Sequence, residues 1–182
     1  NGIITNDTCQ EMIKERIFID DHLFYSKTNY GNEECIEEAA IFFYTTGTTG
    51  DPKCVMFSQE AFFHNISDLA QAIQLSEKDV LYTPLALDLT ASLTTAALPS
   101  LFTGSTLVLS PKQLPRSIFN TIQKYKVSVF FAVPYIYELL VESMAGTGSW
   151  KTTNLRLCLS SSAYLSKILI ARFKDMTGIC IR

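Results

Sequence analysis

The sequence lacks the features that mark membrane-spanning, secreted and nucleic-acid-binding proteins. None of its apolar runs approaches the roughly 20 residues that a membrane-spanning helix needs. The amino terminus has no basic segment followed by an apolar stretch, so no signal peptide is predicted. The net charge is −3 and lysine and arginine form no dense cluster, which argues against a nucleic-acid or membrane-surface partner.

Cysteine is present but not in a pattern that builds a metal site or a disulfide framework. There are five cysteines, an odd number, and no two of them form a C-x-x-C pair. We therefore expect no structural metal and no disulfide scaffold. Unpaired thiols are typical of a reducing compartment, and the sequence predicts a cytoplasmic protein.

The composition is that of a folded domain. Hydrophobic residues make up 47% of the 182 residues and charged residues 18%, which is enough for one good core. The chain begins without methionine and ends on Gly178, Ile179, Cys180, Ile181 and Arg182, a run typical of the start of a buried strand. We expect it to be an internal part of a longer protein.

Short apolar runs alternate with longer segments of helical periodicity. The apolar runs predict strands over residues 41–44, 54–57, 80–83, 106–109, 127–133, 155–159 and 179–181. Helices are predicted over residues 61–73, 91–102, 115–125, 134–144 and 165–176, with Ser58 as the N-cap of the first. This alternation predicts an α/β fold, a mainly parallel β-sheet with helices on both faces. Residues 1–40 would be a lead-in segment, and residues 41–182 the sheet-and-helix subdomain.

Parallel sheets place ligand sites in the loops that follow the carboxyl ends of their strands. Three loops meet this condition, over residues 45–53, 83–90 and 160–163.

The first of these loops reads YTTGTTGDPK over residues 44–53. Its glycines allow several successive backbone N–H groups to point at one anion, the threonine hydroxyls add donors, and Lys53 adds a positive charge. A Walker A loop is excluded, because Lys53 is followed by Cys54 and a strand rather than by a hydroxyl residue and a helix. The G-x-G-x-x-G fingerprint is also absent. A simple hairpin connection is the structural alternative.

This loop resembles the signature loop of the adenylate-forming superfamily, whose members are acyl-CoA synthetases, luciferases and the adenylation domains of nonribosomal peptide synthetases. The family pattern is approximately Y-[ST]-S-G-[ST]-T-G-x-P-K-G. The sequence departs from it at Thr46, where serine is usual, and at Cys54, where glycine is usual. Thr46 keeps the hydroxyl, whereas Cys54 adds a side chain and changes how closely the backbone can approach a ligand.

The resemblance extends over nearly all of the chain. The segment VMFSQEAFFHNI is similar to the strand and helix that follow the signature, and Ser160–Ser166 is similar to the "SGGAPL" turn that lies against adenine. The last residues, TGICIR, look like the strand before the "YGxTE" motif. The resemblance thus implies the central part of the large N-terminal domain, with the C-terminal domain and its catalytic lysine absent.

For the complete protein the resemblance implies an ATP-dependent ligase that converts a carboxylic acid to an acyl-adenylate, releases pyrophosphate and passes the acyl group to a thiol. The thiol would be that of CoA or of carrier-protein phosphopantetheine. The resemblance assigns ATP as cofactor, and Mg²⁺ with ligands outside this chain. The phosphates would be held by Thr45, Thr46, Gly47, Thr48, Thr49, Gly50 and Lys53. Lys53 would neutralise charge on the leaving pyrophosphate, and Ser161, Ser162 and Ala163 would border the adenine.

The loop TPLALDLTAS, residues 83–92, bears on the carboxylate substrate. Acyl-CoA synthetases have an aromatic residue or histidine where this chain has Ala86 and Leu87. Peptide-synthetase domains have an aspartate that binds the α-ammonium group of the substrate. The matching position in this chain is Thr90, and Asp88 would match only if the alignment shifted by two residues. Asp88 could instead be a helix N-cap. The absence of a residue secure at the ammonium position favours an uncharged acyl or aryl acid.

Two other functions stay open. One is an amino-acid-activating adenylation domain of a nonribosomal peptide synthetase. The other is a nucleotide-binding or scaffold module without catalysis, which Cys54 and the unusual loop over residues 83–90 would allow. In either enzymatic case we expect residues 1–182 alone to be inactive.

Overall fold

A four-stranded parallel sheet forms the centre of the structure. The computed structural model describes residues 39–45, 53–110, 112–145 and 154–182. The sheet consists of β3 (Val80–Thr83), β4 (Thr106–Leu109), β5 (Val129–Ala132) and β6 (Leu157–Ser160), in the order β4-β3-β5-β6. All three pairs of neighbouring strands are parallel. The predicted mainly parallel sheet is therefore confirmed.

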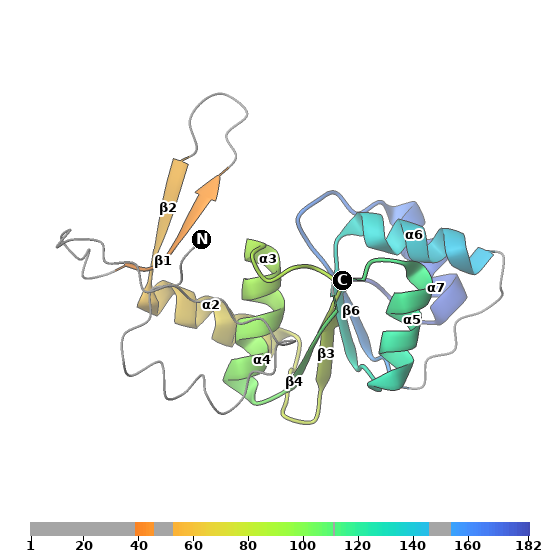
Figure 1. Ribbon diagram of the computed structural model, residues 1–182, viewed down its shortest axis with the longest axis horizontal. Coiled ribbons are helices and arrows are strands. Elements are labelled where there is room, and N and C mark those ends of the chain that lie inside the picture. Colours follow the sequence, from red (N-terminus) through yellow and green to blue (C-terminus); the bar gives the residue numbers. More distant parts are fainter. Residues whose placement is uncertain (1–38, 46–52, 111, 146–153) are drawn as a thin grey trace. The chain divides into compact units, whose positions relative to one another are not determined.

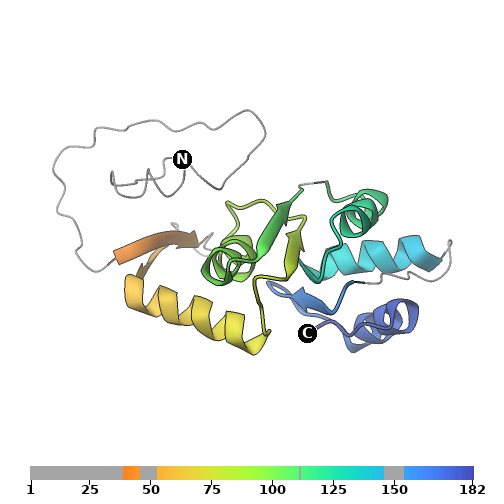
Figure 2. The ribbon, with the colours of Figure 1, turned by 90° about the horizontal axis from the view of Figure 1, so that it is seen from below.

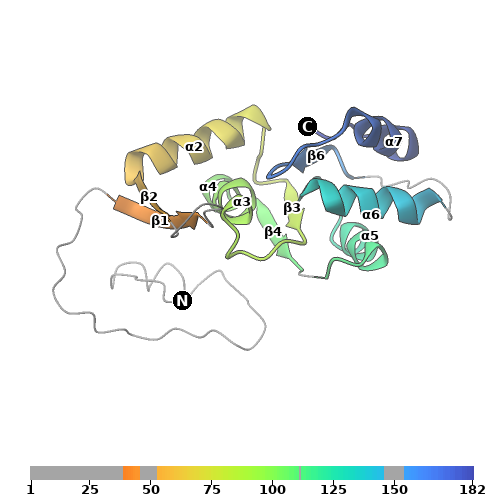
Figure 3. The same cartoon turned by 90° about the horizontal axis from the view of Figure 1, so that it is seen from above.

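Helices cover both faces of this sheet (Figures 1, 2 and 3). One face carries α5 (Pro115–Lys124), α6 (Pro134–Ala145) and α7 (Lys167–Thr177). The other carries α2 (Gln59–Ala72) and a helical segment made of α3 (Thr90–Ser92), the π-helical η1 (Leu93–Ala97) and α4 (Leu98–Thr103). The strands are apolar on both sides, and they pack against both helix layers, as predicted.

Successive strand residues point to opposite faces and enter two separate apolar clusters. Tyr82 and Phe130 pack with residues of α5, α6 and α7. Leu81 and Phe131 pack with residues of α2 and η1. All four side chains are fully buried, so a strand residue on either face contributes to a core.

The two strands that flank the Gly/Thr loop form a separate antiparallel ribbon. β1 (Ala39–Thr45) pairs with β2 (Lys53–Ser58), and Thr45 is opposite Lys53 at the end of the ladder next to the loop. The loop is thus a hairpin connection, and its expected place at the carboxyl end of a parallel strand is wrong. The N-cap prediction for α2 is confirmed, because Ser58 Oγ accepts a hydrogen bond from Ala61 N at 3.2 Å.

Several helices and strands have bounds that differ from those predicted from the hydrophobic pattern. The apolar stretch over residues 127–133 is strand only over Val129–Ala132, and residues 179–181 contribute a single parallel bridge between Cys158 and Ile181 rather than a strand. The helix expected over residues 91–102 contains the π-helical turn η1, and Leu101 and Phe102 at its end are exposed. Gly104, at φ 72°, ends it in the left-handed conformation that glycine adopts readily.

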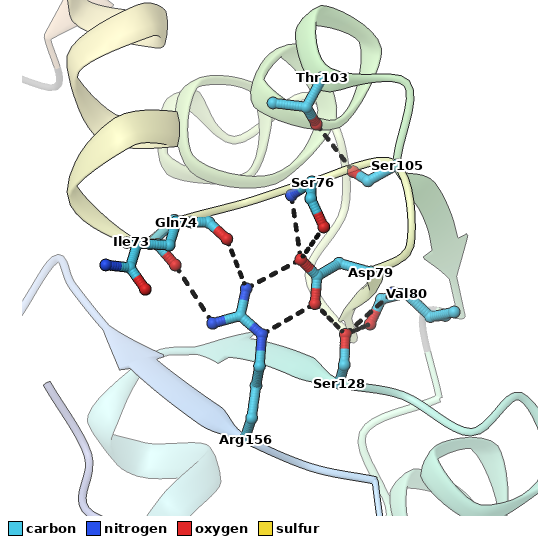
Figure 4. Close-up of polar contacts among 9 residues, drawn as sticks. All are labelled: Ile73, Gln74, Ser76, Asp79, Val80, Thr103, Ser105, Ser128 and Arg156. Atoms are coloured by element: carbon cyan, nitrogen blue, oxygen red, sulfur yellow. Dashed lines mark hydrogen bonds and ion pairs between the residues drawn. The ribbon is translucent and has the colours of Figure 1, made fainter.

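A buried ion pair fixes the amino edge of the sheet (Figure 4). Asp79, which is 6% exposed, precedes β3, and Arg156 precedes β6. Arg156 donates from Nε to Asp79 Oδ1 and from Nη2 to Asp79 Oδ2, both at 2.8 Å. The hydrogen bonds from Arg156 hold the pKa of Asp79 well below its ordinary value, although burial opposes the shift.

The same pair connects the starts of three strands to the end of α2. Ser128, which precedes β5, donates from Oγ to Asp79 Oδ1 at 2.7 Å. Arg156 also donates to the carbonyl oxygens of Ile73, at 3.2 Å, and Gln74, at 2.9 Å, at the carboxyl end of α2. The network therefore sets the alignment of β3, β5 and β6 from the edge opposite their carboxyl ends.

Candidate functional site

The carboxyl edge of the parallel sheet brings two of the predicted site segments to one side of the fold. β3 ends at Thr83, where the loop over residues 83–90 begins, and β6 ends at Ser160, where the serine turn begins. Because these strands run in the same direction, both segments leave the sheet at the same edge. β5 lies between them, so its following residues, Val133 to Tyr135, are also part of this edge.

A buried tyrosine holds the ends of β5 and β6 together. Tyr137 is fully buried, and its hydroxyl donates to the carbonyl oxygens of Leu159, at 2.9 Å, and Phe130, at 3.2 Å. Burial raises the pKa of Tyr137, so its proton is retained. Tyr135, two residues earlier, is 60% exposed at the start of α6. Of these two tyrosines, Tyr137 belongs to the core and Tyr135 is accessible to a ligand.

The serine turn after β6 has the backbone of a glycine turn. Ser162 has φ 73°, in the left-handed region that favours glycine. Ser161 is partly exposed, and Ser162 and Ala163 are exposed, as residues that border a ligand must be. Ser160 donates its backbone N–H to Arg182 O at 2.8 Å, and its buried hydroxyl has no hydrogen-bond partner. The sequence predicts Ser160 as the start of the serine turn, but not that its hydroxyl is buried without a partner.

Replacing Ser162 with glycine is expected to raise the free energy of unfolding by about 0.5–1 kcal/mol, because an L-residue in this conformation is strained. Ser161→Gly is the matched control. Ser161 has no positive φ, so glycine there should lower stability by roughly the same amount through added backbone entropy. Urea unfolding of the three proteins measures both changes, and a Ser162→Gly variant less stable than the parent would contradict the assignment of strain.

The predicted substrate residues form an open loop. Ala86, Asp88 and Thr90 are exposed and Leu87 is partly exposed. The loop is anchored at its start, where Thr83 Oγ1 accepts a hydrogen bond from Leu85 N at 3.2 Å. The N-cap position of α3 is Leu89, without a side-chain hydrogen bond, so the interpretation of Asp88 as an N-cap is wrong. The carboxylate of Asp88 is thus free of that structural role.

The helix that follows this loop contains two features that hydrophobic periodicity could not predict. In η1 the backbone bonds span five residues, as in the bond from Leu98 N to Leu93 O. Such π-helical turns are frequent at functional sites. Ser92, directly before η1, is fully buried, and its hydroxyl has no hydrogen-bond partner. The helix therefore carries a free polar group close to the predicted substrate loop.

The predicted phosphate loop is described only at its two ends. Thr45 and Lys53 are cross-strand partners in the β1–β2 ribbon, which brings the first and last residues of the loop together. Cys54 pairs with Tyr44, so the residue that replaces the usual glycine occupies a regular strand position. The other five predicted phosphate-binding residues lie outside the described residues: Thr46, Gly47, Thr48, Thr49 and Gly50.

The described part of the chain offers no metal centre. Within it, no group of three or more histidine, cysteine, aspartate or glutamate side chains is placed to hold a metal ion. At the carboxyl edge, Asp88 is the one carboxylate among the predicted site residues. These residues do not fit a magnesium site, and no chemical step is assigned here to a metal. None of the described helices is long and apolar enough to cross a membrane.

Comparison with known proteins matches the chain to one family of enzymes. The sequence profile described as "AMP-binding enzyme" matches residues 7–181. Oxalate–CoA ligase of Arabidopsis thaliana is 26% identical over 144 residues, which covers 78% of this chain and 28% of that protein. The hybrid PKS-NRPS synthetase apdA of Emericella nidulans is 31% identical over 121 residues, 62% of this chain and 3% of that protein.

A solved structure is similar to this chain in both fold and sequence. ATP-bound MatB from Rhodopseudomonas palustris superposes with a TM-score of 0.71 at 28% identity, covering 79% of this chain and 28% of that protein. The chain therefore spans 28% of the length of both Oxalate–CoA ligase and MatB.

Proposed function

The chain belongs to the family of AMP-binding enzymes, and from this premise we propose that it is part of an ATP-dependent acid–thiol ligase. The complete protein would activate a carboxylic acid as an acyl-adenylate and pass the acyl group to the thiol of CoA or of a carrier protein. The observation that carries the proposal is the YTTGTTGDPK loop between two paired strands, in a chain whose relatives include CoA ligases and a PKS-NRPS synthetase.

In the first proposed step, a carboxylate oxygen of the substrate attacks the α-phosphorus of ATP and pyrophosphate leaves. The backbone N–H groups and hydroxyls of residues 45–50 would hold the β- and γ-phosphates. The Lys53 ammonium would offset the negative charge that accumulates on the departing pyrophosphate. The turn at Ser161–Ala163 would border adenine and so orient the α-phosphorus toward the acid.

In the second proposed step, a thiol sulfur attacks the acyl carbonyl carbon and the bond to AMP breaks. The thiol loses its proton and AMP leaves with the oxygen that came from the carboxylate. We assign the acceptance of this proton to groups of the complete protein beyond residues 1–182.

The open loop over residues 83–90 favours an uncharged acyl or aryl acid as the substrate. Ala86 and Leu87 present small and apolar surface, and Thr90, at the position of the ammonium-binding aspartate, carries no charge. One observation supports the α-amino acid alternative: Asp88 is exposed and does not cap α3. Its carboxylate would then pair with the substrate ammonium group.

Carboxylate-dependent exchange of labelled pyrophosphate into ATP, measured on the complete protein with a panel of acids, tests the proposal. We expect exchange with at least one acyl or aryl acid and no effect of Asp88→Asn on it. Exchange that requires an α-amino acid and is lost in Asp88→Asn would instead establish the adenylation-domain alternative. ATP binding without exchange for any acid would favour a scaffold module and contradict the ligase.

A further inference from the structure

A cavity of about 360 Å³ lies between the edge strand β4 and helix α5. This volume is within the range of roughly 300–1,000 Å³ that is usual for small-molecule sites. Its lining is mainly polar, and it consists of Val108, Leu109, Ser110, Lys112, Ser117, Asn120, Thr121, Lys124 and Tyr125. Two ammonium groups, four hydroxyls and an amide thus surround one space.

The cavity is separate from the turn that is assigned to adenine. β4 lies at one edge of the sheet and β6, which leads into the Ser161–Ala163 turn, lies at the other end of the strand order β4-β3-β5-β6 (Figures 1 and 3). Two strands therefore stand between the cavity and the turn assigned to adenine.

The segment that forms the cavity carries charge of one sign. From Leu89 to Tyr137 the sequence contains no aspartate or glutamate, although the whole chain has a net charge of −3. Four basic residues fall in this stretch, of which Lys112 and Lys124 line the cavity and Arg116 and Lys126 are their neighbours in sequence. The local potential is positive and favours an anion.

The two lining lysines are free to bind a ligand. Neither forms an ion pair with any described residue. The Lys124 ammonium is held 4.8 Å from the centre of the Tyr125 ring, and both side chains line the cavity. This cation–π contact places one charge at the wall without neutralising it.

A buried tyrosine whose hydroxyl has no hydrogen-bond partner lies beside two residues of the cavity lining. Tyr82 is fully buried, and its hydroxyl makes no hydrogen bond of good geometry. The side chains of Ser110 and Thr121, which line the cavity, lie beside it and oppose the rise of its pKa, but burial prevails and raises the pKa of Tyr82 to about 12. A core position next to the cavity is therefore polar and keeps its proton as a donor.

We propose that this cavity binds the phosphate group of a small phosphorylated molecule. Ammonium and hydroxyl donors without a competing carboxylate are the groups that bind phosphate oxygens, and a compact lysine charge suits a tetrahedral dianion. The site would add to the ligase a second anion site, between β4 and α5.

Titration of the ¹⁵N-labelled chain with inorganic phosphate, at constant ionic strength against chloride, tests this site. We expect saturable NMR shift changes at Ser110, Lys112, Thr121 and Lys124. In a Lys112→Gln/Lys124→Gln variant the affinity for phosphate at these residues should fall at least tenfold. Shift changes that do not saturate, or that spread evenly over all exposed lysines, would overturn the proposal.

The matched control is Lys167→Gln/Lys174→Gln, which removes two exposed charges from α7. Lys174 lies in the last turn of α7 as Lys124 lies in the last turn of α5, so the two variants lose similar charges from similar positions. The control should bind phosphate as the parent does. An equal loss in both variants would show that general charge, and not the cavity, attracts phosphate.

Discussion

Replacing Lys53 with alanine in the complete protein is expected to lower carboxylate-dependent ATP–pyrophosphate exchange by about 10²–10³-fold, the usual effect of removing one preorganised group that stabilises developing charge. Lys53 lies opposite Thr45 in the β1–β2 ribbon, at the base of the predicted phosphate loop. In the proposed reaction its ammonium group offsets the negative charge on the leaving pyrophosphate. The effect should therefore appear mainly in the rate of exchange at saturating ATP.

Lys174→Ala provides the control for this substitution, since Lys174 is exposed on α7 and belongs to no proposed site. Exchange by the control should equal that of the parent protein. If Lys53→Ala retained more than about a third of the parent rate while the control was unchanged, the lysine would have no part in charge stabilisation.

Replacing Arg156 with alanine is expected to lower the free energy of unfolding by about 2–4 kcal/mol, because it leaves the carboxylate of Asp79 buried without its counter-ion. The Arg156 side chain is 39% exposed, which places the loss below that of a fully buried pair. The variant would also lose the bonds to Ile73 and Gln74 that tie the end of α2 to the start of β6 (Figure 4). Urea unfolding measures the change.

The effect of Arg156→Ala should depend on pH. The pKa of Asp79 is lowered in the folded protein, chiefly by its hydrogen bonds with Arg156, so its stabilising contribution is present above the ordinary pKa of 3.8 and is lost as the pH falls below that value. The stability difference between parent and variant should be constant from about pH 5 to pH 8 and shrink below about pH 4.

Arg156→Lys tests whether the charge of Arg156 is sufficient without its paired hydrogen bonds, and Arg172→Ala is the control. Lysine keeps the charge but cannot donate in parallel to both oxygens of Asp79, so we expect it to recover only part of the loss. Arg172 is exposed on α7, and its replacement should change stability by less than about 0.5 kcal/mol. A small effect of Arg156→Ala, equal to that of Arg172→Ala, would contradict the structural role of the pair.

The layered fold could be predicted from sequence because the apolar pattern of the strands and the residues that start the helices both indicate the same arrangement. The run VFFA, residues 129–132, is apolar on both faces, and the structure buries it fully between two helix layers. Ser58 and Pro115 mark the starts of α2 and α5, where local hydrogen bonding or a fixed φ favours a helix start. In such cases the local preference and the tertiary packing agree.

The remaining features depend on contacts between residues far apart in the chain. Asp79 and Arg156 are separated by 77 positions, and each alone looks like an ordinary surface charge. The pairing of β1 with β2 is antiparallel, a choice that apolar content does not encode. The left-handed backbone of Ser162 is invisible to periodicity, although comparison of the serine turn with a glycine motif does mark the position.

The most direct test of the proposed reaction follows the substrate oxygens. The complete protein is supplied with ATP, the thiol acceptor and a carboxylic acid labelled with ¹⁸O at both carboxylate oxygens, and the released AMP is analysed by mass spectrometry. Attack of the carboxylate on the α-phosphorus followed by thiol transfer predicts AMP that carries one ¹⁸O atom. Unlabelled AMP, or ¹⁸O found in inorganic phosphate, would contradict the acyl-adenylate route.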